Sequence, residues 1–104
     1  MARAVLILDR ARDDMDMAHD FYDRCEIGVG DYFIDCILSD ISSLKFYFGL
    51  HRMQYGFHRL SSKRFPYSIY YEVEEEVVRI VAVLDMRMKP SIIRELVNAR
   101  REDG

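Results

Sequence analysis

The spacing of apolar residues near the start of the chain predicts a strand followed by a helix. Residues 3–8 are short, aliphatic and partly β-branched, which is typical of a strand buried on both faces. Asp9 is then the expected N-cap of a helix, because a side-chain oxygen there can accept a hydrogen bond from the first helical turn. The apolar stripe of this helix recurs at steps of four and three. It consists of Ala11, Met15, Ala18, Tyr22 and Cys25.

A second helix follows after a short glycine-containing turn. Gly28-Val29-Gly30 ends the first helix, and the second is expected to start near Asp31. Its expected apolar face consists of Phe33, Ile34, Ile37, Leu38, Ile41 and Leu44. Because so few residues separate the two helices, we expect them to form an antiparallel hairpin.

Beyond residue 56 the apolar period falls to two, which predicts strands. One run begins at Phe57, and a half-buried strand is expected over residues 65–73, with Pro66 near its start. Residues 77–84 are apolar on both faces and predict a central strand. Pro90 opens a last amphipathic helix, which we expect to pack on the sheet. Helices and strands are segregated along the chain, which favours an α+β fold with a helical hairpin on a small, mainly antiparallel sheet, in the order β-α-α-β-β-β-α.

Length and composition indicate a single domain spanning residues 1–104. Half of the residues are apolar, so the chain can bury a core. The apolar run Ala4–Leu8 is shorter than the roughly 7–15 residues of a signal peptide and the roughly 20 of a membrane span. We therefore expect a soluble, cytoplasmic protein with no membrane contact. Cys25 and Cys36 are expected to be buried small hydrophobes rather than a disulfide or metal ligands.

The net charge of −3 conceals an uneven distribution of charge along the chain. Residues 9–40 contain ten acidic residues against three arginines, whereas residues 41–72 contain five basic residues and Glu72 as their one acid. The acidic block is best explained as a solvated face. The basic block is either a solvated face or a surface for an anionic partner, and it leads directly into the most distinctive motif of the chain.

That motif comprises three strings in the second half of the chain. Residues 63–71 read Lys-Arg-Phe-Pro-Tyr-Ser-Ile-Tyr-Tyr, residues 77–84 form the apolar strand, and residues 85–90 read Asp-Met-Arg-Met-Lys-Pro. Together they resemble the C-terminal half of RelE/ParE superfamily toxins, which are the toxic partners in bacterial type II toxin–antitoxin pairs. The resemblance is strong over residues 50–90, and the order of the earlier elements agrees with the fold of that family.

The resemblance implies a small toxin neutralised by a co-expressed antitoxin. Ribonuclease members of the family cut mRNA in the translating ribosome, whereas ParE members inhibit DNA gyrase, and the fold alone does not separate these activities. In the ribonucleases the site lies on the exposed face of the sheet, with Arg or Lys binding phosphate. The resemblance implies neither a cofactor nor a metal. A homodimer and a toxin–antitoxin hetero-oligomer are both compatible with the sequence.

Cutting RNA without a metal requires a base for the ribose 2′-OH, a cation for the phosphorane and an acid for the leaving oxygen. Cations on or beside adjacent strands are candidates for binding phosphate or a partner if they converge on one face. They are Arg59, Lys63, Arg64, Arg87 and Lys89. The alternative for Arg64 and Arg87 is an ordinary structural ion pair.

Candidates for proton transfer are fewer. His58 is the best of them, because the pKa of histidine lies in the useful range. Asp85 stands where many relatives have His, but beside Arg87 we expect it to stay ionised and paired. Ser68 stands where several ribosome-dependent relatives have a phosphate-binding Arg, which counts against a RelE-like mechanism. Candidates for stacking on bases, with core packing as the alternative, are Phe65, Tyr67, Tyr70 and Tyr71, of which Tyr67 and Tyr70 are the leading ones.

The sequence therefore predicts a type II toxin inhibited by a cognate antitoxin. The leading hypothesis for its action is metal-independent cleavage of mRNA on the ribosome, with His58, Arg64, Asp85 and Arg87 as the catalytic candidates. The alternatives are a ParE-like gyrase inhibitor without chemistry of its own and an inactive member that only binds its antitoxin.

Overall fold

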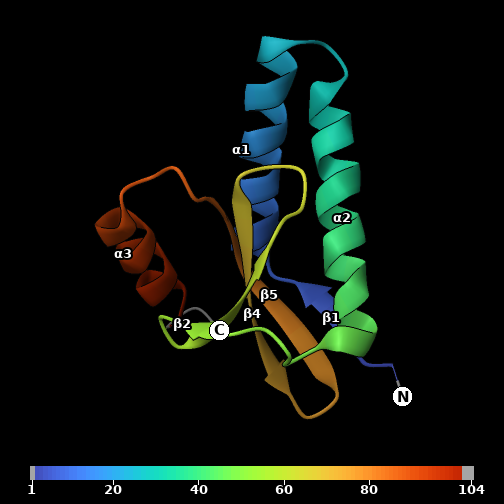
Figure 1. Cartoon of the computed structure of the whole chain (residues 1–104), viewed down its shortest axis with the longest axis vertical. Helices are drawn as coiled ribbons and strands as arrows, with labels where there is room; N and C mark the ends of the chain where they lie inside the picture. Colours follow the sequence, from blue (N-terminus) through green and yellow to red (C-terminus); the bar gives the residue numbers. More distant parts are fainter. Residues whose placement is uncertain (1, 102–104) are drawn as a thin grey trace.

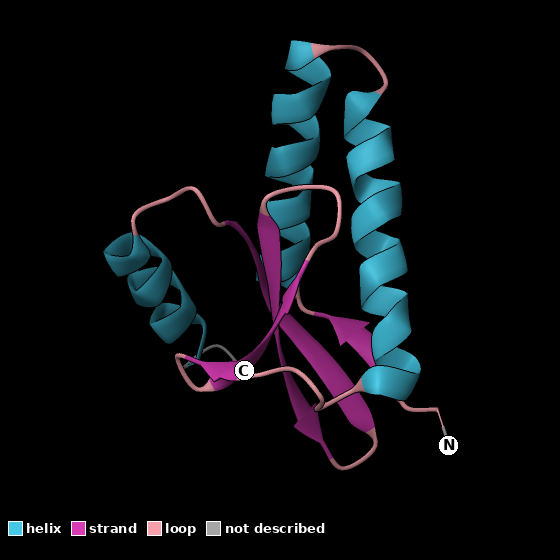
Figure 2. Ribbon diagram, viewed as in Figure 1, coloured by secondary structure: helices cyan, strands magenta, loops and turns pink. Residues whose placement is uncertain are grey.

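A helical hairpin stands against one side of a five-stranded sheet, and a shorter helix covers part of the other side (Figures 1 and 2). The computed structural model describes residues 2–101. Its elements are β1 (Ala4–Ile7), α1 (Asp9–Cys25), α2 (Val29–Tyr47), β2 (Met53–Gln54), β3 (Phe57–Ser61), β4 (Tyr67–Glu74), β5 (Val77–Asp85) and α3 (Pro90–Arg101). The predicted α+β fold and helical hairpin are confirmed.

The sheet has the order β1-β5-β4-β3-β2, with β1 parallel to β5 and the other neighbours antiparallel. The predicted central position of residues 77–84 is confirmed, since β5 lies between β1 and β4. The short strand β2 was not predicted, because it lies in the stretch between Gly49 and Gly56 that has no apolar alternation. Tyr55 and Gly56 connect it to β3 with φ angles of 55° and 87°, and such positive values suit a two-residue hairpin turn.

The helical hairpin and one face of the sheet share the larger of two buried apolar clusters. It includes Ala11 and Met15 from α1, Phe33 and Ile37 from α2, and Ile69 from β4. The stripe predicted for α1 fades toward the tip of the hairpin, where Tyr22 is half-buried and Cys25 is exposed. The expectation that both cysteines are buried is therefore wrong for Cys25, and Cys36 is half-buried; both are free thiols.

Two element boundaries differ from the predicted ones. The N-cap of α1 is Leu8, which makes no side-chain cap, and Asp9 is the first helical residue, where its charge suits the positive end of the helix dipole. The second helix starts at Val29 rather than Asp31. Gly28 takes the turn with a φ of 95°, so Gly30 is free to continue as helix.

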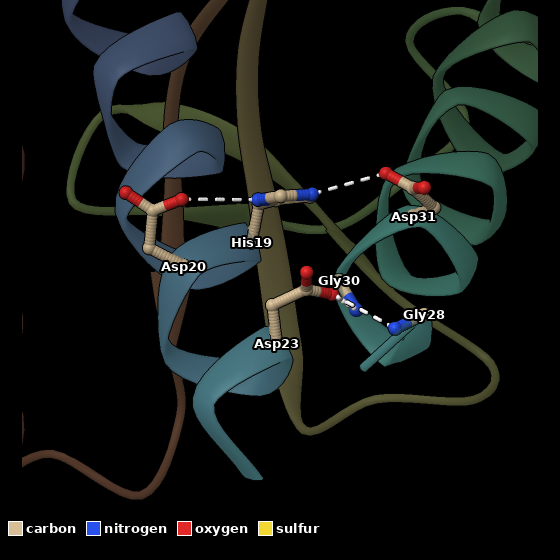
Figure 3. A network of polar contacts seen from close by, with 6 residues as sticks. All are labelled: His19, Asp20, Asp23, Gly28, Gly30 and Asp31. Carbon is tan, nitrogen blue, oxygen red and sulfur yellow. Dashed lines mark hydrogen bonds and ion pairs between the residues drawn. The ribbon is translucent and has the colours of Figure 1, made fainter. Parts of the chain in front are cut away.

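Gly30 lies where the two helices of the hairpin approach closely (Figure 3). A Cβ at Gly30 would lie 2.5 Å from the backbone oxygen of His19, so only glycine fits there. The Asp23 carboxylate accepts hydrogen bonds from the backbone N–H groups of Gly28 and Gly30 at 3.2 and 2.8 Å. His19 Nε2 lies 3.0 Å from Asp31 Oδ1 on the facing helix. These contacts fasten the tip of the hairpin.

β4 is buried on both faces over residues 67–71, although a half-buried strand was predicted. The reason is α3, which packs Ile93 and Val97 against Tyr70 on the face opposite the hairpin. The predicted packing of the last helix on the sheet is thus confirmed, and it buries the second face of β4. Phe65, the expected start of the strand, instead precedes it and contacts the Tyr22 ring edge-on.

A buried ion pair holds α3 in place. Arg100 donates to both carboxylate oxygens of Asp14 at 2.8 Å and to the Val81 carbonyl at 2.9 Å. Asp14 also accepts the backbone N–H of Val83 at 2.9 Å. The Arg100 and Asp14 side chains are only 10% and 11% exposed, so α1, β5 and α3 meet at one desolvated charge pair. Among residues 2–101, no helix is long and apolar enough to cross a membrane.

Candidate functional site

Asp85 and Arg87 form a close ion pair at the end of β5. Arg87 Nη2 donates to Asp85 Oδ2 at 2.8 Å, Arg87 Nε donates to Oδ1 at 3.0 Å, and the Arg87 backbone N–H also donates to Oδ1. The hydrogen bonds from the Arg87 side chain lower the pKa of Asp85 despite its partial burial. Asp85 is therefore ionised and engaged, as expected from the sequence, and it is a poor base at neutral pH.

The Asp85–Arg87 pair lies at a groove between α1, β5 and α3. The groove is lined by Met17, Phe21, Tyr67, Leu84, Met88 and Leu96 together with Asp14, Arg24, Asp85 and Arg100. Tyr67 is only 8% exposed, and burial raises the pKa of its hydroxyl to about 12. Tyr67 thus packs in the core and does not present its ring for base stacking.

Arg59 points to the opposite face of the sheet. Its Nε donates to Ser68 Oγ at 2.9 Å and its Nη1 donates to Gln54 Oε1 at 3.1 Å. Ser68 is fully buried, so it anchors Arg59 instead of supplying a phosphate-binding group. Tyr70 is also fully buried under α3, and its hydroxyl contacts Met86 Sδ at 3.8 Å. Burial removes Tyr70 from base stacking as well.

The remaining predicted cations are exposed and dispersed. Lys63 and Arg64 lie in the loop between β3 and β4, in a pocket that they share with Asp35 and Asp40 of α2. Lys89 is exposed just before α3. The five predicted cations therefore do not converge on one face, because Arg59, the Lys63–Arg64 pair and Arg87 are held by different layers of the fold.

His58 belongs to a hydrogen-bonded group around Tyr71, in the middle of β4. Its Nδ1 lies 2.7 Å from the backbone oxygen of His51, and its ring stacks on Tyr71 with centroids 5.0 Å apart. His51 Nδ1 lies 2.6 Å from the Tyr71 hydroxyl, which also accepts the Gly49 backbone N–H at 3.0 Å. We call His51, His58 and Tyr71 the histidine cluster. It forms where the loop after α2 crosses the edge of the sheet.

Burial changes the titration of the histidine cluster. Desolvation, followed by the nearby charge of His58, lowers the pKa of His51, so its imidazole is neutral at pH 7. Burial raises the pKa of Tyr71, which keeps its hydroxyl protonated. His51 and His58 are both half-buried.

His58 and Asp85 were nominated for one site, but the register of β4 separates them. Asp85 pairs with Tyr67 and His58 pairs with Tyr71. Tyr71 follows Tyr67 by four residue steps, which corresponds to about 13 Å along β4. The predicted catalytic set is therefore divided between two places, and no single phosphate can contact both His58 and Asp85.

Sequence reasoning missed His51 and its hydrogen bond with Tyr71. The contact between His51 and Tyr71 depends on the unpredicted strand β2, which pairs with β3. This pairing brings His51 and His58 to the same tyrosine ring. An available clue was the placement of two histidines on either side of the turn at Gly56. Within residues 2–101, no group of three or more His, Cys, Asp or Glu side chains has an arrangement that would hold a metal ion.

Comparisons with known proteins match this chain to several solved structures. No family model matches the chain, and neither does any curated protein. A solved structure described as "Chromosomal ParDE TA system from P. aeruginosa" superposes with a TM-score of 0.75 at 15% sequence identity. The match covers 83% of this chain and 98% of that one. Nearly the whole of that chain is thus reproduced, and the fold described above is a ParE-like toxin fold.

Proposed function

We propose that this protein is the toxin of a bacterial type II toxin–antitoxin pair and that it is neutralised by a cognate antitoxin. The observation that carries this proposal is the match to a chain from a ParDE system, which extends over most of both chains. The strings at residues 63–71 and 85–90 support it independently, because they resemble the same superfamily. Action in the cytoplasm follows from this role.

The first candidate for the toxic action is metal-independent cleavage of mRNA on the ribosome. Residues 41–71 contain no Asp or Glu. No carboxylate of this segment would therefore repel the phosphates of an RNA chain. That segment includes the half-exposed His58, whose Nδ1 is occupied by a carbonyl group and whose other ring nitrogen is available. Asp85 no longer belongs to the candidate machinery, because Arg87 holds it as a carboxylate.

The second candidate is inhibition of DNA gyrase by binding, without chemistry. It is favoured by the end of β5, where Arg87 holds Asp85 in an ion pair and the side chain of Ser68 is buried. The likeness in fold to a chain of a ParDE system favours it too. Under this candidate, the groove between α1 and α3 binds a protein partner.

The toxin proposal is tested by expressing the chain alone and together with the product of a small adjacent gene. We expect growth arrest from the chain alone and rescue by the co-expressed product, with the two proteins co-purifying as a complex. A chain that causes no growth defect, yet still forms that complex, would identify an inactive member. A chain that does neither would remove the toxin proposal.

The target is tested on the same preparation by primer extension on reporter mRNAs and by a gyrase supercoiling assay. Cuts at ribosomal A-site codons with unchanged supercoiling would establish mRNA cleavage. Inhibited supercoiling with intact mRNA would establish the gyrase candidate instead. Because the two assays report on different macromolecules, one preparation decides between the candidates.

A further inference from the structure

The strand β1 leaves one edge of the sheet open. It is the outermost strand on its side and pairs with β5 alone (Figure 1). Ala4 and Leu8 donate their backbone N–H groups to carbonyl groups at and just before β5. Since backbone groups alternate in direction along a strand, the N–H and C=O groups of Val5 and Ile7 point away from the sheet. No hydrogen bond of these outward groups is observed within residues 2–101.

The sequence of β1 does not protect this open edge from pairing with another strand. Natural edge strands are commonly shielded by a charged side chain, a proline or a β-bulge. β1 reads Ala-Val-Leu-Ile, and its register with β5 is unbroken. Leu6 is 50% exposed on the face of the sheet that carries α3. The opposite edge of the sheet is β2, which is only two residues long. The edge of β1 is therefore the better template for a further strand.

Two contacts set the length of the open edge. At one end, Arg3 donates its backbone N–H to the carbonyl oxygen of Lys45 at 3.0 Å, so the end of α2 closes the edge. At the other end, the helix α1 begins at Asp9. Leu6 is the midpoint between these two positions. An added strand therefore pairs with residues 4–8 and is centred on Leu6.

We propose that this edge binds the same edge of a second copy of the chain, so that two chains pair through β1 about a two-fold axis at Leu6. In an antiparallel pair centred there, Val5 of each chain lies opposite Ile7 of the other. Because these residues carry the open groups, each of the two pairs exchanges both of its N–H···O=C hydrogen bonds. Such a self-complementary edge is what a two-fold dimer requires. This dimer is independent of the toxin proposal, because it depends on the sheet alone.

The charges that flank β1 agree with this register. Counted outward from Leu6, Arg3 of one chain stands opposite Asp9 of the other at both ends of the paired strands. The guanidinium carbon of Arg3 lies 4.6 Å from the centroid of the Phe48 ring, and Arg3 Nε is buried without a hydrogen-bond partner within residues 2–101. Lys45 adds a second cation beside Arg3, and Asp9 is exposed. Each end of the pair therefore joins a cationic site to a carboxylate of the second copy.

The face of the sheet that carries α3 has room for a second Leu6 side chain. A hollow beside β1 is lined in part by Leu6, Leu8 and Val81. Leu6 and Leu6 of the second copy form a non-hydrogen-bonded pair, in which the Cα atoms are about 4.5 Å apart and the side chains touch. The pairing therefore removes the exposed surface of both leucines from water, which favours the dimer.

Disulfide cross-linking tests the register. In a Cys25→Ser, Cys36→Ser background, Leu6→Cys should give a covalent dimer under mild oxidation, because a disulfide spans Cα atoms about 4.5 Å apart. Ala4→Cys is the matched control, since Ala4 is exposed on the same face of the same strand. In this register Ala4 lies about 13 Å along the strand from its own copy and should not cross-link. Equal cross-linking at the two positions would contradict the pairing.

A proline variant tests the open hydrogen-bonding groups. Val5→Pro removes the outward N–H of both chains of the dimer. It should raise the dimer dissociation constant roughly tenfold or more in sedimentation equilibrium, because two hydrogen bonds are lost. Val5→Ala controls for the half-buried side chain and should have a smaller effect. Met53→Pro places a proline on the opposite edge of the sheet and should leave the dimer unchanged. Circular dichroism verifies that every variant is folded.

Charge reversal tests the contact between the two chains. Arg3→Glu and Asp9→Lys should each weaken the dimer, because like charges then face each other at both ends. When the two single variants are mixed, opposite charges face each other again. Native mass spectrometry should therefore show the mixed dimer in excess over both homodimers. A structural effect within one chain cannot produce that preference.

Three results would overturn the proposal. The first is a wild-type protein that stays monomeric at every concentration measured. The second is a dimer that Val5→Pro and Leu6→Lys leave unchanged, and the third is a mixture of the charge variants without excess of the mixed dimer. Protection of the Val5 and Ile7 amides only in the complex with the antitoxin would show that a different strand occupies the edge, and would also count against the dimer. Growth arrest is scored in parallel, so loss of the dimer with growth arrest retained leaves the toxin proposal intact.

Discussion

Two tyrosines of β4, Tyr67 at its start and Tyr71 in its middle, lie among side chains that are engaged in different ways. Tyr67 lies beside Asp85, Arg87, Asp14 and Arg100, and the charged groups there pair with opposite charges. Tyr71 holds His51 and His58 by neutral hydrogen bonds and ring contacts. We call the region around Tyr67 the ion-paired end and the region around Tyr71 the neutral end.

This difference teaches which groups remain available for function. An ion pair satisfies both partners and fixes their protonation over the physiological range. A neutral imidazole needs only one of its nitrogens for structure and keeps the other for a ligand. The ion-paired end therefore contributes mainly to stability, while the neutral end retains reactive atoms. Each of the following experiments separates these contributions.

The largest expected effect is the loss of stability when the buried pair of the ion-paired end is broken. Arg100→Ala leaves the Asp14 carboxylate desolvated without its cation, which costs about 3–5 kcal/mol of the free energy of unfolding. Urea denaturation measures this cost. Arg94→Ala, on the exposed side of the same helix, is the control and should change stability by no more than about 0.5 kcal/mol. Equal effects of the two changes would show that the pair does not anchor α3.

A smaller loss is expected from a single hydroxyl at the neutral end. Tyr71→Phe leaves the Gly49 N–H and His51 Nδ1 without their partner, at a cost of about 1–3 kcal/mol. Tyr67→Phe removes the matched hydroxyl at the ion-paired end, where no side-chain hydrogen bond of Tyr67 is observed within residues 2–101, and should cost less. Thermal denaturation of the two variants compares them directly. A larger loss of stability for Tyr67→Phe than for Tyr71→Phe would contradict this prediction.

The sequence predicted the Asp85–Arg87 pair of the ion-paired end but not the contacts of the neutral end, for a physical reason. Asp85 and Arg87 are two residues apart on the chain, so their pairing follows from local geometry. The contact between His51 and Tyr71 joins residues twenty positions apart and requires β2, a strand of only two residues. The helices and long strands followed from apolar periodicity. The burial of Tyr70 did not, because it depends on where α3 docks.

The two ends should also respond differently to acid. The pKa of His51 is lower in the folded state than in the unfolded chain. As the pH falls through about 6.5, the unfolded chain therefore takes up this proton before the folded protein does, and the free energy of unfolding decreases. The folded-state pKa of Asp85 is lowered as well, but from 3.8, so its contribution is complete at pH 5 and is lost only below that range. Between pH 7 and pH 5 the neutral end alone should therefore weaken.

His19, at the tip of the hairpin, affects stability in the opposite direction to His51, and NMR titration of the individual histidines separates the two contributions. Hydrogen bonds to Asp20 and then Asp31 raise the pKa of His19, whose stabilisation is complete below the unfolded value and is lost as pH rises. In a His19→Gln background, stability should fall from pH 7 to pH 5, and adding His51→Gln should flatten the curve. A midpoint of His51 above that of a free imidazole would contradict this assignment.

The smallest expected effect on stability is that of Arg87→Ala, although it removes three side-chain hydrogen bonds to Asp85. The Arg87 side chain is 58% exposed, and such surface ion pairs contribute about 0–1 kcal/mol. The variant should instead raise the pKa of Asp85, because the largest influence lowering it is gone. Carboxyl-carbon NMR titration measures that change, with Arg94→Ala as the control. An unchanged Asp85 titration would mean that the backbone N–H of residue 87 alone holds the carboxylate. In that case the ion-paired end and the neutral end would differ by backbone geometry and not by the pairing of side-chain charges.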